Sequence, residues 1–467
     1  MKFALAGIAV VVIGLAIWSI ATADAATETP STGGSVDNMS PAVLSKDLPV
    51  DVDTSNLPKD EDGNQFTFES LQPRFDRFSW ETFVALNWPT GLDRIPTGKR
   101  IGEEPDNLTV WELWKEDYEI FLENGTPPDK WGADRRPPSS FSPAFKKMFD
   151  EKQAALRKTG KPLTVLEASV EPFDTGPLID QNGKYARFEI LVNEDMFNDI
   201  VNKKLYSKAG QEARGGHVIF TCGSKLGANP RIQGSIMIKA SWKVLAPDEK
   251  AAGKFHTADC LVHTTESKVP KIEEHCELVT LGLVGFHIVH KTFTRPQWVW
   301  STFEHVDNCP TLGKEADRPS YNFYSKFQYE GLLSQNSPPS PPWDPTVTEP
   351  PERRSQIKRI IDVGKDAQDQ NGPFQKLLGK SVWANYQLIS TQWPSKVANP
   401  QNCDPQTAIP GDLIGLPAPQ FLGNSTLESY VPKRTVNVSS SCIECHANAT
   451  ATNGRFSDFT FLLLRAK

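Results

Sequence analysis

Hydrophobic and polar residues alternate most regularly in the middle of the chain, over residues 232–244. Ile236 and Ile238 share one phase of this alternation, and Lys239 lies in the other. Because successive side chains of a strand point to opposite faces, the pattern predicts a long strand with one buried face. Weaker strand patterns occur at residues 163–170, 185–193, 217–221, 277–293 and 298–303. They follow one another without intervening helices, which indicates an antiparallel sheet over residues 160–305.

Helical patterns, with apolar residues three or four positions apart, flank the predicted sheet on both sides. Before the sheet, helices are expected at residues 79–88, 111–124 and 142–160, each followed or ended by proline or glycine. After it, they are expected at residues 354–363 and 374–392, with a further short helix at residue 442. The predicted fold is therefore α+β, with a central antiparallel sheet flanked by N- and C-terminal helices.

The N-terminal region predicts export. Residues 1–25 combine an early lysine, an unbroken apolar run and a small-residue pattern that ends at Ala25, which is typical of a cleaved signal peptide. A retained membrane anchor is the alternative, because the apolar run is long enough to span a bilayer. Residues 26–64 are rich in Thr, Ser, Pro, Gly and Asp and are expected to form a flexible tether. Residues 65–467 are expected to form one large domain, sheet-rich over 160–305 and helical over 354–450, in the periplasm or outside the cell.

Charge and cysteine content narrow the class of protein. The net charge is −7, with basic and acidic residues mixed along the chain, so no basic stripe is available for nucleic acid. In an exported protein the seven cysteines are expected to pair or to hold a cofactor. If two of them hold a cofactor, five remain, which allows at most two disulfides and one free thiol. The sequence leaves the pairing open among Cys222, Cys260, Cys276, Cys309 and Cys403.

The strongest chemical signal is the pentapeptide Cys442-Ile-Glu-Cys445-His446, the attachment pattern of c-type haem. Residues three apart on a helical turn share a face, so both thiols can reach the vinyl groups on one edge of the porphyrin. The adjacent imidazole of His446 then becomes an iron ligand. A thioredoxin-like thiol pair needs a βαβ context and a zinc site needs a second ligand pair at finger-like spacing, and the sequence pattern offers neither. One motif predicts one covalent haem c, and the export signal meets the requirement that haem c is attached outside the cytoplasm.

The second iron ligand is an open question. Only residues 447–467 follow the motif, and they contain no methionine, so the ligand comes from earlier in the chain or is missing. The available residues are Met39, Met148, Met196, Met237, His217, His256, His263, His275, His287, His290 and His305. His287 and His290 lie in an apolar segment with Gly282 and Gly285, where small residues leave room for a bulky group. On a strand the two histidines point to opposite faces, so at most one can be the distal ligand, and each could instead be a core histidine bonded to backbone.

Two aromatic features could lie at the edge of a haem pocket. Trp242, Trp298 and Trp300 fall on predicted strands, and residues 456–464 form an apolar tail. Buried aromatic residues usually belong to the core. The tail is more simply explained as a terminal strand that docks on the sheet.

Several segments resemble a group of long bacterial proteins with a C-terminal c-type haem motif: residues 83–89, 287–292, 298–308, 382–393, and the motif followed by 457–463. The resemblance covers most of residues 75–467 and implies location and cofactor only. A weaker similarity is to the cytochrome P-460 group, β-rich haem c proteins in which the iron keeps an open site and a strand lysine is linked to the haem. Lys239 lies on a strand in this chain, but no catalytic role is carried over to it.

Two functions are compatible with these patterns. The first is electron transfer to a redox partner protein through a six-coordinate haem. The second is an oxidoreductase with an open iron site that acts on peroxide, a nitrogen oxide or a small organic substrate, with His287 or His290 as distal acid or base. The lack of another catalytic motif favours the first, and the large scaffold favours the second. A purely structural role for the haem is a third reading, and a membrane partner is expected only if the N-terminal segment is retained.

Overall fold

The main sheet of the computed structural model is built around β6 (Ile236–Val244), whose alternating side chains give the sheet two different faces. Ile238 and its neighbours in phase are buried with Phe83 of helix α1 (Phe68–Leu86) in the largest apolar cluster. Met237, in the other phase, is buried with Ile443 of helix α9 (Cys442–His446). We call these two sides of the sheet the α1 face and the α9 face.

The structure describes residues 42–54, 68–103, 108–157, 164–166, 175–315, 317–329, 335–395, 403, 416–430 and 441–467. Residues Pro41–Lys467 form one compact unit. The predicted signal peptide and most of the predicted tether lie outside the described residues. One part of the tether, residues 42–54, is packed rather than free, because Leu48, Val50 and Val52 bury their side chains and Asp51 accepts a 2.6 Å hydrogen bond from the Thr294 hydroxyl.

Within the described residues the main sheet has nine strands, seven of them in the order β13-β12-β11-β10-β6-β5-β3. β7 extends it beside the first half of β10, and β4 pairs with β7. All pairs are antiparallel except β4 with β7. The remaining bounds are β3 (Lys115–Glu116), β4 (Thr164–Leu166), β5 (Arg187–Val192), β7 (Thr257–Thr264), β10 (His275–His290), β11 (Val299–His305), β12 (Tyr386–Pro394) and β13 (Pro417–Ala418). The α+β class and its large antiparallel sheet are therefore as predicted.

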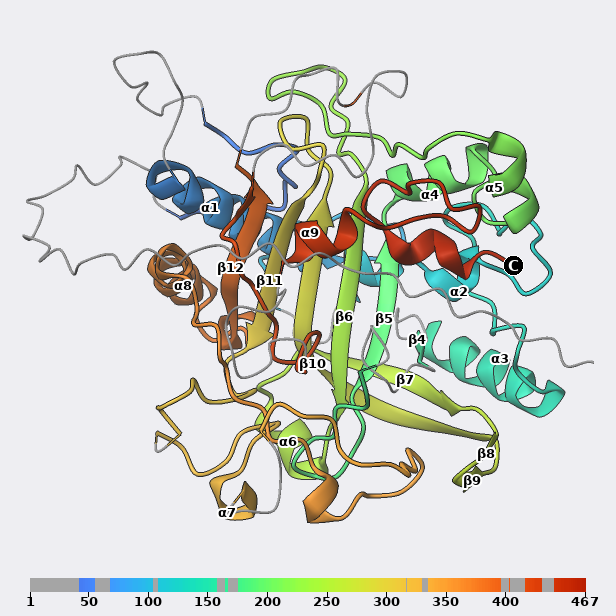
Figure 1. Cartoon of the computed structure of the whole chain (residues 1–467), viewed down its shortest axis with the longest axis vertical. Coiled ribbons are helices and arrows are strands. Elements are labelled where there is room, and N and C mark those ends of the chain that lie inside the picture. Colours follow the sequence, from blue (N-terminus) through green and yellow to red (C-terminus); the bar gives the residue numbers. More distant parts are fainter. Residues whose placement is uncertain are drawn as a thin grey trace, which may run out of the picture. The chain divides into compact units, whose positions relative to one another are not determined.

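Two long helices lie on one face of the sheet, and the short helix α9 lies on the other (Figure 1). α1 and α8 (Lys365–Leu378) pack against each other and against β12 on the α1 face, where Trp80 stacks on Phe374 at 5.1 Å. The short helix α9 crosses the opposite face near β12 and β11. Other helices are α2 (Asp117–Ile120), α3 (Pro143–Arg157), α4 (Glu194–Asn202), α5 (Lys208–Arg214), α6 (Pro247–Ala252) and α7 (Lys326–Tyr329). A last 3-10 turn, η5 (Phe461–Arg465), packs near α9.

Several predicted elements are wrong. Residues 374–392 are not one helix: α8 ends at Leu378 because Gly379 adopts a positive φ of 58°, and β12 then begins at Tyr386. Of the described residues in 354–450, α8 and α9 are α-helical and β12 and β13 are strands, so this part of the chain is not mainly helical as predicted. Residues 354–363 form no helix, residues 111–124 form a 3-10 turn, a two-residue strand and a single α-turn, and residues 217–221 run beside the C-terminal tail without forming a strand. Ser79 does not begin a helix, since α1 starts at Phe68.

Candidate haem site

The attachment motif forms helix α9, as predicted. Ser441 caps its N-terminus, with Oγ accepting from the backbone N–H of Glu444 at 3.3 Å. The Ile443 side chain is fully buried, and its N–H donates to Oε1 of Gln392 on β12 at 2.9 Å. These contacts dock one side of the helix on the sheet. Cys442, Cys445 and His446 share the other side, at least partly exposed, and neither thiol is in a disulfide.

One nitrogen of His446 is committed to the backbone. Nδ1 lies 2.8 Å from the carbonyl oxygen of Phe459, and since a carbonyl only accepts, Nδ1 carries the hydrogen. Nε2 is then the lone-pair nitrogen. Burial lowers the pKa of His446 to about 4 despite the opposing hydrogen bond to Phe459, so the ring is neutral at pH 7. A neutral imidazole held through Nδ1 is the usual state of a histidine that ligates a metal through Nε2.

The Phe459 carbonyl is presented by a turn that the sequence did not reveal. Asp458 and Phe459 have positive φ values of 55° and 65°, which cost energy for residues with a Cβ. Asp458 is buried, and its carboxylate accepts from the Lys291 ammonium at 2.9 Å and from the Phe220 N–H at 2.7 Å. These bonds hold the turn in place. The tail is therefore a turn followed by η5, not the predicted terminal strand.

Aromatic rings flank His446. The Trp300 ring lies 4.5 Å from the imidazole, centroid to centroid, and Phe461 lies at 5.2 Å on η5. Of the three tryptophans singled out from the sequence, Trp300 contacts the motif. Trp242 packs in the core cluster of the α1 face, and Trp298 is buried beside Phe220.

The structure separates His287 from His290. As predicted, they point to opposite faces of β10. His290 is buried on the α1 face, where it stacks on Phe78 at 5.5 Å and its Nε2 donates to the carbonyl oxygen of Gln233 at 2.7 Å. It therefore lies across the sheet from α9, and strand alternation removes it as a distal group. His287 pairs in register with Lys239 of β6 and lies on the α9 face.

Three charged or polar side chains gather beside the motif on this face. Nε2 of His287 lies 2.8 Å from Oε1 of Glu428, in the segment that follows β13. Lys239 and Glu428 both contribute to the electrostatic environment of Cys442, Cys445 and His446. Burial would raise the pKa of Glu428, but His287 and Lys239 hold it below its ordinary value, so the group is a carboxylate at pH 7.

These residues supply the two thiols and the imidazole that a covalent haem would need. Two unpaired thiols and one imidazole with a lone pair on Nε2 share one side of a helical turn, and Trp300 supplies an aromatic wall. In the part of the chain that the structure describes, no three His, Cys, Asp or Glu side chains are grouped as ligands of a bare metal ion. A haem iron does not need such a group, because the porphyrin nitrogens supply its equatorial ligands.

Several of the other ligand candidates already contact other groups. His305 is stacked on Phe255 at 4.2 Å, and its Nδ1 accepts from the N–H of Asp307. His256 and His263 each contact a glutamate oxygen at 3.0 Å, and the Met237 sulfur accepts from the Thr460 hydroxyl at 3.4 Å. Met39 lies outside the described residues.

The cysteine pairing left open by the sequence is partly resolved. Cys222 and Cys403 form a disulfide. Cys260, Cys276 and Cys309 are not in disulfides. The structure therefore has one of the two disulfides that the count allowed.

None of the helices in the described ranges is both long and apolar enough to cross a bilayer. Comparison with protein-family models, with curated proteins and with solved structures finds no match for this chain.

Proposed function

We propose that this chain is an exported monohaem c-type redox protein that transfers electrons, with the haem bonded to Cys442 and Cys445 and its iron held by His446. The single observation that carries the proposal is the state of His446. Its Nδ1 is fixed by the Phe459 carbonyl, its ring is neutral, and its Nε2 is the nitrogen left for iron.

The surroundings suit a redox cofactor. When bound, the haem supplies an iron that cycles between its ferrous and ferric states. Gln392 and Ser441 orient the helix, and the Asp458 turn holds the ligand ring against Trp300. Cys445 and Glu444 are exposed, so an edge of a haem bonded there would face solvent and a redox partner protein. The apolar N-terminal segment supports a periplasmic or secreted location, or an anchored one if that segment is retained.

Intact-mass measurement tests the attachment. The chain is produced in a bacterial host that attaches haem c in the periplasm, beside a variant with Cys442→Ala and Cys445→Ala. We expect the mass of one haem on the wild type and none on the variant. A wild-type chain with the bare polypeptide mass would refute the proposal.

One observation favours a second function, an oxidoreductase with an open iron site. His287, the distal candidate on the α9 face, already binds Glu428 through Nε2, and the pair lies beside a lysine. Such a polar group is more typical of a site that handles a small ligand than of a simple carrier. Carbon monoxide added to the reduced protein separates the two functions: a shift of the Soret band favours the open site, and an unchanged band favours the six-coordinate carrier.

A further inference from the structure

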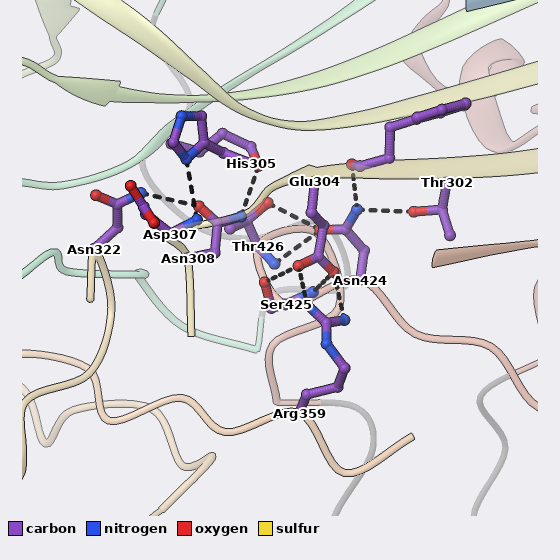
Figure 2. A network of polar contacts seen from close by, with 12 residues as sticks. Thr302, Glu304, His305, Asp307, Asn308, Asn322, Arg359, Asn424, Ser425 and Thr426 are labelled. Atoms are coloured by element: carbon purple, nitrogen blue, oxygen red, sulfur yellow. Dashed lines mark hydrogen bonds and ion pairs between the residues drawn. The ribbon is translucent and has the colours of Figure 1, made fainter. Parts of the chain in front are cut away.

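The loop that carries Glu428 is fixed to the sheet by a buried ion pair (Figure 2). Arg359 makes two contacts to the Glu304 carboxylate, at 3.1 and 2.5 Å, and both side chains are buried. The same carboxylate accepts from the backbone N–H of Ser425 at 2.6 Å and from its hydroxyl at 2.5 Å. Ser425 is therefore held at the end of β11 by a charge-assisted network.

Neighbouring residues complete the attachment. The Asn424 side chain donates to the hydroxyl of Thr302 at 2.8 Å and to the carbonyl of Phe303 at 3.0 Å, both on β11. Thr426 lies so close to β10 that a Cβ on Gly285 would come within 2.0 Å of its hydroxyl oxygen. A loop this tightly fixed holds Glu428 in one place.

Glu428 has a defined hydrogen-bond partner on each oxygen. Oε2 accepts from the backbone N–H of Asn424 at 3.0 Å, and Oε1 faces Nε2 of His287 at 2.8 Å. Because a carboxylate only accepts, the His287 hydrogen is on Nε2, and in the neutral ring Nδ1 carries the lone pair. Among the described residues no hydrogen bond to Nδ1 of His287 is found.

We propose that Nδ1 of His287 accepts a hydrogen bond from a small protic ligand at the haem iron, such as hydrogen peroxide, and that Glu428 is its positioning residue. This inference rests on the proposed haem attachment and on the open iron site of the second function. Glu304, Arg359 and the Asn424 loop set the place of Glu428, and Glu428 sets the tautomer and orientation of His287. An iron-bound ligand would then meet the Nδ1 acceptor of His287 on this side, next to Lys239 in cross-strand register.

A single substitution reverses the tautomer. In Glu428→Gln the Asn424 N–H still needs an acceptor, so the amide oxygen takes the place of Oε2 and the NH₂ group faces His287. The amide then donates to Nε2, and the ring hydrogen moves to Nδ1. In the ferrous carbon monoxide complex, we expect this new donor to lower the C–O stretching frequency and to slow carbon monoxide release about two- to tenfold, as a hydrogen bond would.

Matched variants separate this effect from a general loss of structure. Glu274→Gln alters a similar pair, in which a glutamate oxygen lies 3.0 Å from Nε2 of His263 on β7, and should leave the C–O frequency and the release rate unchanged. Ser425→Ala loosens the loop and should broaden the C–O band. In a His287→Ala background, Glu428→Gln should have no further effect.

Two results would overturn the inference. One is a Glu428→Gln protein that binds carbon monoxide with wild-type frequency and release rate. The other is a reduced wild type that binds no carbon monoxide, since the sixth position would then be filled. Both differ from failure of the proposed function, in which mass measurement finds no haem.

Discussion

Three histidines of this chain each contact a glutamate, and the three pairs lie in different parts of the fold. His256 contacts Glu112 on the α1 face, His263 contacts Glu274 near the end of β7, and His287 contacts a carboxylate beside α9. The residue types were visible in the sequence, but Glu428 is 141 positions from His287. Only the folded chain brings such a pair together, which explains why sequence patterns named the histidine and missed its partner.

His290 should make stability depend on pH. Burial lowers its pKa from 6.5 to about 4 in the folded state. A depressed folded pKa gives stability that is fully present above pH 6.5 and is lost as the pH falls toward 4. The loss amounts to about 3 kcal/mol over this window, at about 1.4 kcal/mol for each pKa unit.

Urea unfolding of the wild type and of His290→Gln at pH 7 and pH 4 measures this effect. The substituted side chain can still donate to the Gln233 carbonyl but does not titrate. The free-energy difference between the two proteins should shrink, by up to about 3 kcal/mol, between pH 7 and pH 4. If the unfolding free energies of the two proteins change in parallel with pH, the lowered pKa of His290 is contradicted.

Sequence patterns predicted the helices and strands that are determined by residues close together in the chain. β6 follows from strict alternation, α3 from its proline start, and α9 from the motif with a serine cap. α1 was predicted too short because Ser79 resembles an N-cap. In the structure its hydroxyl lies 2.6 Å from both the Ser301 and Thr391 hydroxyls, which are far away in the sequence. A serine hydroxyl usually competes with the helix for backbone hydrogen bonds. These tertiary partners bind the hydroxyl and remove that competition.

The close approach of the Asn424 loop to β10 predicts a sensitive glycine. In Gly285→Ala the new methyl group would meet the Thr426 hydroxyl at 2.0 Å, so the loop or the strand must move. We expect a loss of about 1–3 kcal/mol in the free energy of unfolding, as for overpacked cores.

Gly216→Ala is the matched control, because its Cβ would have nothing within 4 Å. It should change stability by less than about 0.5 kcal/mol. Equal effects of the two substitutions, measured by urea unfolding, would show that the loop does not press on β10.

Over the whole molecule, distant parts of the chain are tied together. The Cys222–Cys403 disulfide joins residues 181 positions apart. Asp51, near the start of the described chain, bonds to Thr294, and Lys291 bonds to Asp458 near its end. Composition measures average polarity, and on that basis residues 42–54 were predicted to be part of a flexible tether. Their burial depends instead on three apolar side chains that pack against the rest of the protein.

Reduction of the Cys222–Cys403 disulfide should lower the free energy of unfolding. A loop of this length loses about 5 kcal/mol of stabilisation when its cross-link is opened, on the chain-entropy account. Urea unfolding with and without a thiol reductant measures it, and thioether-bonded haem would survive the treatment. A Cys276→Ser protein should behave as the wild type does, since Cys276 forms no disulfide. An unchanged midpoint on reduction would show that the unfolded chain is already constrained.

The two halves of β10 have different neighbours. Residues 285–290 are flanked by β6 and β11, whereas most of residues 275–282 pair with β7 alone. Each amide hydrogen in the doubly flanked half bonds to one of two strands inside the sheet, and neither strand is at its margin there, so these amides should exchange with solvent far more slowly. His287 belongs to that slow half, which means that partial opening of the sheet margin leaves its backbone undisturbed.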